Sequence, residues 1–403
     1  MKVLLAHNFY GSGAPSGENE VFKSESRLLQ RNKYELSEFC RYSDEIRAEG
    51  LRGTMKGALS TPWNPFSAHK IQREIETFRP DVVHVHNTFP LLSPAIFHAI
   101  GGRAARVLTL HNYRVFCPAG VPMRDGNICT KCLDRRSALP SLLYGCYRNS
   151  RIATLPLASS VSLHRFLGTW SKQVDAFIAL TSFQREVMVE AGLPRDLVHV
   201  KPNFFPGNPT VTPWSERKDC AVFVGRLSEE KGILSLVKAW LMWGSTAPEL
   251  RVIGDGPLRP ELDRLVREAP DVSIKILGQL SSNAAQNEIA KSRLLLVPSE
   301  CFEGFPMVVR EAFAFGTPVA ASDIGPLPTI VKSGENGFLF QPKNSVSLWN
   351  KVRSDWNGEN RLERLGHGAR RSFEKLYTEK TNLEKLEAIY ERAINVNKNR
   401  RDK

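Results

Sequence analysis

Short apolar runs that alternate with helical segments are the feature of this chain that most restricts its fold. In the first half, runs of this kind occur at residues 1–6, 82–86, 107–111 and 174–181. The second half repeats the pattern from residue 221 onward. Such runs between helices are typical of parallel sheets covered on both faces. A chain of 403 residues is long for one core and fits two domains. We therefore predict an α/β protein with two parallel sheets.

Composition and charge narrow the classes of partner. The chain is 42% hydrophobic and 24% charged, which is ordinary for a soluble globular protein. Its net charge of +13 favours anionic partners, such as nucleic acid, anionic lipid or a phosphorylated small molecule. We expect no nucleic acid partner, since no basic repeat is interleaved with aromatic residues.

The apolar runs also bear on location. No run reaches the roughly 18 apolar residues of a membrane span, and the apolar run at the N-terminus is short for a secretory signal, so we expect a cytoplasmic location.

The stretch from residue 298 to 325 is the strongest candidate for a ligand site. A polar loop with Glu303 precedes a helical run, and Glu311 is expected two turns along that helix. Gly316 and Pro318 then end the helix before a short buried strand. A helix N-terminus offers free N–H groups and a positive dipole to an anion. The alternative is a pair of solvated carboxylates, with Glu303 as a helix cap.

Two further loops suit a phosphorylated ligand. Arg226 and Lys231 bracket a turn just before a helix, where a guanidinium and an ammonium can hold a diphosphate. A glycine-rich loop at residues 11–21 runs into a helix expected at 20–31, and its glycines allow a phosphate to approach the backbone. The dinucleotide pattern G-x-G-x-x-G is absent, which disfavours a nicotinamide dehydrogenase. An ordinary surface turn and an ordinary flexible loop remain the alternatives.

His86 and His111 each stand at the end of an expected strand, followed by Asn. Ligands of parallel sheets bind beyond the carboxyl ends of the strands, so both histidines are candidates for ligand contact. Isolated histidines are more often structural, and that alternative stays open.

Four of the seven cysteines, Cys117, Cys129, Cys132 and Cys146, lie within thirty residues. One C-x-x-C with two outlying cysteines can supply four thiolates to a tetrahedral, structural zinc ion. Unliganded or redox-active thiols are the alternative. Four protein ligands would leave no open position on zinc, so we expect no catalytic role for the metal.

Residues 137–170 mix arginines with leucines and aromatic residues. We interpret this segment as a candidate surface for a lipid-phosphate acceptor or an anionic membrane. The alternative is an ordinary helix pair with its arginines in water.

The motifs GRLSEEKG, GDGP, ILGQL, PSECFEGFPMVVREAFAFGTPVAASDIGPLPTIV and SGENGFLF together resemble the C-terminal domain of family 4 glycosyltransferases. The first strand, the glycine loop and TLHN extend the resemblance into the first half. The cysteine segment is similar to that of bacterial members from surface-polysaccharide pathways. The resemblance implies a GT-B fold, in which two Rossmann-like domains face a central cleft.

The resemblance also implies a domain division. We expect an N-terminal acceptor domain at 1–200, with a cysteine-rich insertion at 117–146, and a donor domain at 201–370. One helix from about residue 362 through 394 is expected to cross back in part, so that about 371–403 rejoins the first domain.

Residue roles follow from the same match. Glu303 is expected to face the donor-sugar hydroxyls and Glu311 the ribose, while Arg226 and Lys231 clamp the diphosphate and His111 lies near the transferred sugar. The residues expected to act in catalysis are His111, Arg226, Lys231 and Glu303, and those expected to bind the donor are Gly13, Gly17, Gly254, Leu280, Glu303, Gly304, Phe305 and Glu311.

The implied function is retaining transfer of a sugar from a UDP- or GDP-sugar to a glycan or polyprenyl-diphosphate-linked glycan. Exopolysaccharide, capsule or lipopolysaccharide synthesis at the inner face of the plasma membrane would be the setting, and no cofactor is expected for catalysis. The rivals are a nucleotide-sugar epimerase of the same fold and a non-catalytic, zinc-stabilised binding protein.

Overall fold

The structure is a computed structural model that describes residues 1–11 and 16–402. The chain divides into two compact units. Unit 1 comprises Met1–Pro122, Thr130–Pro202 and Asn382–Lys403, and unit 2 comprises Met123–Cys129 and Asn203–Thr381.

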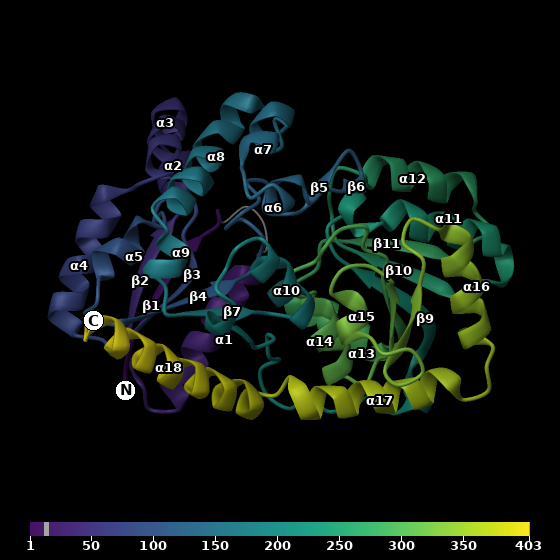
Figure 1. The fold of residues 1–403 in the computed structure, drawn as a ribbon. Helices are drawn as coiled ribbons and strands as arrows, with labels where there is room; N and C mark the ends of the chain where they lie inside the picture. Colours follow the sequence, from purple (N-terminus) through teal and green to yellow (C-terminus); the bar gives the residue numbers. More distant parts are fainter. Residues whose placement is uncertain (12–15, 403) are drawn as a thin grey trace. The chain divides into compact units, whose positions relative to one another are not determined.

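Unit 1 is built on a six-stranded parallel sheet with the strand order β2-β1-β3-β4-β7-β8 (Figure 1). Its strands are β1 (Lys2–Phe9), β2 (Glu35–Tyr42), β3 (Val82–Asn87), β4 (Ala105–Leu110), β7 (Ala176–Ala179) and β8 (Val198–Val200). Its helices are α1 (Gly17–Arg31), α2 (Asp44–Arg47), α3 (Gly50–Ser60), α4 (Pro65–Phe78), α5 (Ala95–Ile100), α6 (Lys131–Asp134), α7 (Leu139–Tyr144), α8 (Arg151–Phe166), α9 (Thr169–Lys172), α10 (Ser182–Glu190) and most of α18 (Glu379–Arg401).

The run at 174–181, expected to form the last strand of the first domain, is followed by one more strand. β8 has three residues, of which only Val198 is buried. A strand this short at a sheet edge leaves no apolar run in the sequence, which is why the prediction missed it.

Unit 2 is built on a second six-stranded parallel sheet, ordered β11-β10-β9-β12-β13-β14 (Figure 1). Its strands are β9 (Lys218–Val224), β10 (Glu249–Ile253), β11 (Ile274–Gly278), β12 (Ser292–Val297), β13 (Val319–Ser322) and β14 (Gly337–Phe340). Its helices are α11 (Ile233–Trp243), α12 (Arg259–Glu268), α13 (Ser282–Lys291), α14 (Met307–Ala314), α15 (Leu327–Ile330), α16 (Ser345–Trp356) and α17 (Arg361–Leu376). A small hairpin, β5 (Met123–Arg124) and β6 (Asn127–Ile128), also belongs to unit 2. The prediction of two parallel sheets is confirmed.

Each sheet packs its apolar residues against helices. In unit 1, Val3 and Val107 of the strands share one buried cluster with Phe22 of α1 and Tyr390 of α18. In unit 2 the fully buried Trp240 of α11 donates its indole N–H to the carbonyl of Pro248 over 2.8 Å. Burying one such large apolar side chain stabilises a fold by about 2 kcal/mol.

The expected single helix from about residue 362 through 394 is wrong. α17 ends at Leu376 and α18 begins at Glu379. Tyr377 is buried between them, and Thr378 Oγ1 accepts a hydrogen bond from the backbone N–H of Thr381 over 3.2 Å. A threonine hydroxyl can thus start a new helix without the glycine or proline that marks a break in sequence.

None of the helices in the described part of the chain combines the length and apolarity needed to cross a bilayer.

Candidate active site

In unit 2, Lys231 and Glu303 form an ion pair at the ends of two adjacent strands. Lys231 lies in a single 3₁₀ turn after β9, and Glu303 lies in the loop after the neighbouring strand β12. The Lys231 Nζ donates to Glu303 Oε1 over 2.7 Å, and Ser299 Oγ donates to the same oxygen over 2.6 Å. Glu303 is therefore neither a solvated carboxylate nor the cap of α14, whose N-cap residue is Pro306.

The environment keeps Lys231 charged. Burial alone would favour the neutral amine, but the Glu303 carboxylate outweighs it and raises the pKa of Lys231. An ammonium that is already held in place beside a half-buried carboxylate can bind an anionic group with little reorganisation.

The two loops that carry the pair touch through their backbones. Gly232 has φ +66°, and a Cβ there would lie 1.9 Å from the carbonyl oxygen of Pro298. The N–H of Glu300 donates to the carbonyl of Glu230 over 2.9 Å. Glycine at position 232 therefore permits the approach that places Lys231 next to Glu303.

Glu311 lies one turn into α14, not two. The helix begins at Met307, directly after its N-cap residue Pro306, so the polar loop is longer than expected. Burial raises the pKa of the Glu311 carboxyl, and the charge of Arg310 and a hydrogen bond from Gln286 only partly offset it.

Two of the other predicted donor residues, Gly304 and Phe305, directly follow Glu303 in the chain. Gly304 is half-buried, and Phe305 is buried with its ring centroid 5.6 Å from that of Tyr377. Leu280 lies two residues beyond β11, which ends at Gly278.

Gly254 and Arg226 lie at the ends of neighbouring strands. Gly254 follows β10 with φ +132°, and a Cβ there would lie 1.9 Å from the carbonyl oxygen of Gly225. The side chain of Arg226 is exposed, and within the described residues it makes no ion pair or hydrogen bond. It remains available to a ligand.

In unit 1 the structure brings His86 and His111 together. β3 carries His86 near its carboxyl end and His111 directly follows β4, as the sequence predicted. The His86 Nδ1 and His111 Nε2 atoms are 3.1 Å apart. Both residues line a cavity of about 70 Å³ with Asn112 and Arg114.

A second polar group near His111 was missed by sequence reasoning. Asn112 Nδ2 donates to Glu18 Oε1 over 2.8 Å, and Arg114 Nη1 donates to the Tyr10 hydroxyl over 3.2 Å. Burial raises the pKa of the Glu18 carboxyl. One feature of the sequence could have revealed Glu18. It follows Gly17 at the start of α1, and that end of the helix comes directly after the first strand, where ligand contacts are expected.

Of the two glycines predicted in that loop, Gly17 is the first residue of α1. Gly13 lies outside the described residues.

Three of the four clustered cysteines, Cys117, Cys132 and Cys146, lie near enough to interact electrostatically. Burial, followed by the nearby Cys132, raises the pKa of the Cys117 thiol to about 12, and Cys146 adds to the shift. Cys129 belongs to the hairpin segment of unit 2, while the other three belong to unit 1. A structural zinc at Cys117, Cys129, Cys132 and Cys146 stays a prediction.

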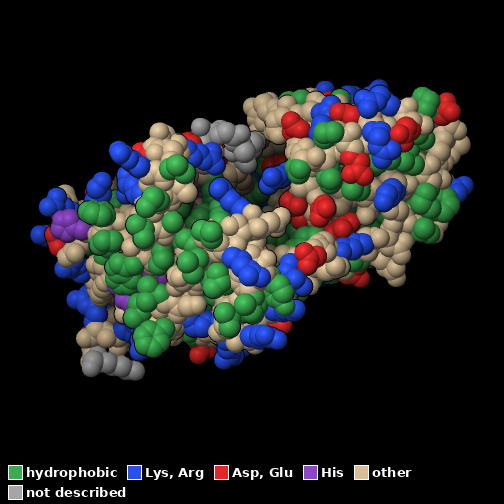
Figure 2. Space-filling model, turned by 90° about the horizontal axis from the view of Figure 1, so that it is seen from above, with side chains coloured by type: hydrophobic (Ala, Val, Ile, Leu, Met, Phe, Trp, Pro, Cys, Tyr) green, Lys and Arg blue, Asp and Glu red, His purple; other side chains and the backbone are tan. Residues whose placement is uncertain are grey.

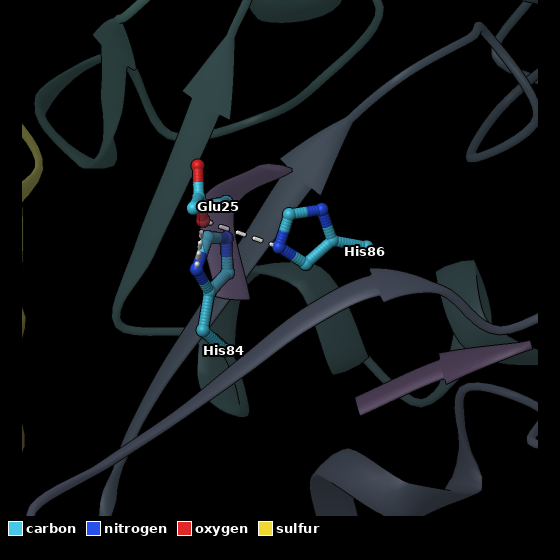
Figure 3. Close-up of side chains that lie close together, drawn as sticks. All are labelled: Glu25, His84 and His86. Carbon is cyan, nitrogen blue, oxygen red and sulfur yellow. Dashed lines mark ion pairs between the residues drawn. The ribbon is translucent and has the colours of Figure 1, made fainter. Parts of the chain in front are cut away.

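Among the described residues, one group of potential metal ligands has its ligand atoms within 4.8 Å of one another: Glu25, His84 and His86 (Figure 3). The Lys201 ammonium lies 2.8 Å from Glu25 Oε2 and already supplies the positive charge that a metal ion would bring. We therefore interpret this group as a charge network, not as a metal site.

Two family models match consecutive parts of the chain. The model "Glycosyltransferase Family 4" matches residues 16–206, and "Glycosyl transferases group 1" matches residues 207–372. Their boundary falls in the irregular stretch that follows β8.

Individual relatives are distant. The putative teichuronic acid biosynthesis glycosyltransferase TuaC of Bacillus subtilis is 23% identical over 392 residues, covering 86% of this chain and 87% of that protein. The sulfoquinovosyl transferase SQD2 of Arabidopsis thaliana is 25% identical over 319 residues, covering 76% of this chain and 56% of that protein. The chain spans about half the length, or less, of several curated relatives that it matches.

Solved structures share the fold. The Anabaena protein HepE in complex with UDP superposes with a TM-score of 0.67 at 18% identity, over 97% of this chain and 100% of that one. The two parallel sheets of this chain and the matches of both family models agree. The chain belongs to the GT-B glycosyltransferases of group 1 and family 4.

Proposed function

We propose that the protein transfers a sugar, with retention of configuration, from a UDP- or GDP-sugar to a glycan or lipid-linked glycan. The observation that carries this proposal is the Lys231–Glu303 pair at the ends of β9 and β12. An ammonium and a carboxylate beyond the carboxyl ends of adjacent parallel strands suit a ligand that is both a diphosphate and a polyol.

Each residue receives a role in this proposal. Lys231 and the exposed Arg226 stabilise the negative charge that develops on the departing diphosphate. Glu303 orients the donor-sugar hydroxyls, Glu311 holds the ribose, and His111 contacts the transferred sugar. The acceptor hydroxyl attacks the anomeric carbon on the face that the diphosphate leaves, and a departing phosphate oxygen takes its proton.

The donor nucleotide is supported by likeness alone. Structures of HepE contain UDP, UDP with glucose, or UDP-glucose. We therefore test UDP-sugars first and GDP-sugars second.

The proposed acceptor is a polyprenyl-diphosphate-linked glycan at the inner face of the membrane, in polysaccharide or lipopolysaccharide synthesis. Three helices of unit 1 expose large apolar side chains, and Figure 2 shows such side chains gathered on this unit with Lys and Arg among them. The exposed residues are Leu51, Met55 and Leu59 of α3, Leu139, Leu143 and Tyr144 of α7, and Ile152, Leu155 and Phe166 of α8.

This surface includes only part of the segment singled out in the sequence. Arg148 and Arg151 are exposed beside the apolar residues, as expected. Trp170 is instead buried, and the guanidinium of Arg165 packs over the Phe116 ring at 4.5 Å. Exposed aliphatic and aromatic side chains with flanking arginines are typical of a membrane-contacting surface.

The test is turnover of UDP- or GDP-sugars with a synthetic polyprenyl-diphosphate-linked acceptor, with the anomeric configuration of the product determined by NMR. We expect an acceptor-dependent product with the anomeric configuration of the donor. An inverted product would refute the retaining mechanism. Donor consumption without acceptor, giving an epimerised sugar nucleotide, would favour the epimerase.

Structural zinc is tested separately. Elemental analysis of the purified protein should find about one zinc per chain, and that zinc should be lost when Cys129 and Cys132 are replaced by Ser. A metal-free wild-type protein would end this hypothesis.

A further inference from the structure

A buried chain of polar contacts runs from Lys201 to His111 inside unit 1. Lys201 Nζ lies 2.8 Å from Glu25 Oε2, and Glu25 Oε1 lies 3.2 Å from His86 Nε2 (Figure 3). His86 Nδ1 in turn lies 3.1 Å from His111 Nε2. The side chains of Lys201, Glu25 and His86 are at most 2% exposed, so water does not compete for these contacts.

The far end of this chain is open. His111 is only half-buried and lines the cavity described above. Within the described residues its Nδ1 has no hydrogen-bond partner. The buried contacts therefore end on the one ring nitrogen that a ligand in the cavity could reach.

Proton counting leaves two arrangements for a neutral pair of histidines. In the first, His86 carries its proton on Nε2, facing Glu25, so its Nδ1 accepts from His111 Nε2–H. In the second, His86 carries its proton on Nδ1 and donates to His111, which places a bare Nε2 lone pair 3.2 Å from the Glu25 carboxylate. The contact is close but is not a well-aligned hydrogen bond, so charge decides between the two arrangements. An N–H beside the buried carboxylate is favourable and a bare nitrogen there is not, so a charged Glu25 selects the first arrangement.

Glu25 is held in its charged form. Burial opposes the charge, but Lys201 and the two histidines hold the pKa of this carboxyl well below its ordinary value. His84 is also part of the support, since its Nδ1 lies 3.0 Å from Glu25 Oε1 and its Nε2 lies 2.7 Å from Thr109 Oγ1. Burial lowers the pKa of His84 to about 4, so this ring is neutral at pH 7.

We propose that Glu25 and His86 are positioning residues that hold His111 in its Nε2-protonated tautomer, so that His111 Nδ1 accepts a hydrogen bond from a hydroxyl group of a sugar. This inference rests on the proposed contact between His111 and the transferred sugar. It specifies the direction of the hydrogen bond in that contact: the sugar hydroxyl donates and the ring nitrogen of His111 accepts.

The first test is the tautomer of His111 in the wild-type protein, read from ¹⁵N chemical shifts of the imidazole nitrogens at pH 7.5. We expect a protonated Nε2 and a bare Nδ1. His164 is an internal reference, because its Nε2 faces the Pro62 carbonyl at 2.8 Å and must carry the proton. A His111 ring protonated on Nδ1 would overturn the proposal without any variant.

The second test is Glu25→Gln. The Lys201 ammonium should draw the amide oxygen of Gln toward itself, which turns the NH₂ group toward His86. His86 Nε2 then becomes an acceptor, and the proton order along the chain reverses. We expect the His111 signals to switch to the Nδ1-protonated pattern, while those of His164 stay unchanged.

Activity gives an independent readout. With a reversed ring, His111 meets a sugar hydroxyl donor to donor, and kcat/KM for the donor sugar should fall about tenfold, the size of one hydrogen bond. Glu20→Gln, on the exposed face of the same helix, is the matched control and should change neither the tautomer nor kcat/KM.

The outcomes separate the two proposals. A Glu25→Gln protein with the His111 tautomer and kcat/KM of wild type would refute the positioning role, as would a metal ion bound at Glu25. A wild-type protein that shows the expected tautomer but turns over no sugar nucleotide would refute the proposed function and leave the tautomer selection intact.

Discussion

Lys231 and Glu303 are partners in one ion pair. The 2.7 Å contact joins a half-buried ammonium to a half-buried carboxylate. In the proposed function, a diphosphate that binds here exchanges one anionic partner of Lys231 for another. Glu303 would then keep the hydrogen bond from Ser299 and gain the sugar hydroxyls.

Replacing Lys231 should therefore reduce catalysis more than folding. We expect Lys231→Ala to lower kcat about 10²- to 10³-fold at saturating donor, because it removes a charge that stabilises the leaving diphosphate. Lys238→Ala, an exposed lysine on α11, is the matched control and should keep wild-type kinetics. Wild-type turnover of Lys231→Ala would refute the assignment.

Glu311 should give the protein a pH-dependent stability. Its folded-state pKa is raised above the ordinary value of 4.5 by burial, so the folded state binds this proton more tightly than the unfolded state. Stability therefore decreases as pH rises from 4.5 through the raised pKa.

The matching variant is Glu311→Gln, which removes the buried charge. Thermal unfolding without ligand should show the variant more stable than wild type at pH 8, with the difference vanishing below pH 4.5. Glu335→Gln, at an exposed position, should show no such trend. A difference that grows as pH falls would contradict the assignment.

Single residues differ in how far the sequence predicts them. Glu303 and Glu311 stand out because they lie in one short motif, and Lys231 because it precedes a helix. Glu25 and Lys201 are 176 residues apart, and neither stands in a motif. Only the packing of α1 against the sheet brings them together, so no local pattern could reveal the chain of contacts that supports His111.

At the scale of elements, the ends of the strands in unit 2 depend on close backbone contacts. The carbonyl of Gly225, after β9, nearly touches Gly254, after β10. Those same strand ends lead to the turns that carry Arg226 and the proposed donor site.

Gly254→Ala tests this contact. Gly192 has a similar φ of +120° but open space around it, so Gly192→Ala shares the backbone strain without the steric clash. We expect Gly254→Ala to reduce the free energy of unfolding by about 1–3 kcal/mol more than Gly192→Ala does. Chemical denaturation measures the free energy of unfolding of both variants. Equal decreases would show that the backbone at Gly225 moves at little cost to accommodate a Cβ at position 254.

Elements were predictable where apolar runs were long and bounded. The strands β1, β3, β4 and β7 lie within a few residues of their expected places. The start of α14 and the break between α17 and α18 were not predictable, because a proline cap and a threonine cap decided them locally. β8 was missed because tertiary pairing, not hydrophobicity, makes it a strand.

At the scale of the whole molecule, the exposed apolar side chains of α3, α7 and α8 predict membrane binding. Vesicles with phosphatidylglycerol should co-sediment the protein better than phosphatidylcholine vesicles, and added salt should weaken binding. Ile152→Glu combined with Leu155→Glu should abolish it, whereas Val346→Glu on α16 of unit 2 should not. Equal binding to both kinds of vesicle would contradict the basic, apolar surface.

The donor site of unit 2 is the central claim, and thermal stabilisation by sugar nucleotides tests it most directly. A donor at about 100 times its Kd should stabilise the wild-type protein by about 2.7 kcal/mol. We predict a rise in melting temperature with at least one UDP- or GDP-sugar, lost in Lys231→Ala and Glu303→Gln and kept in Lys238→Ala. The absence of a shift with every donor, or an equal shift in all four proteins, would contradict the account.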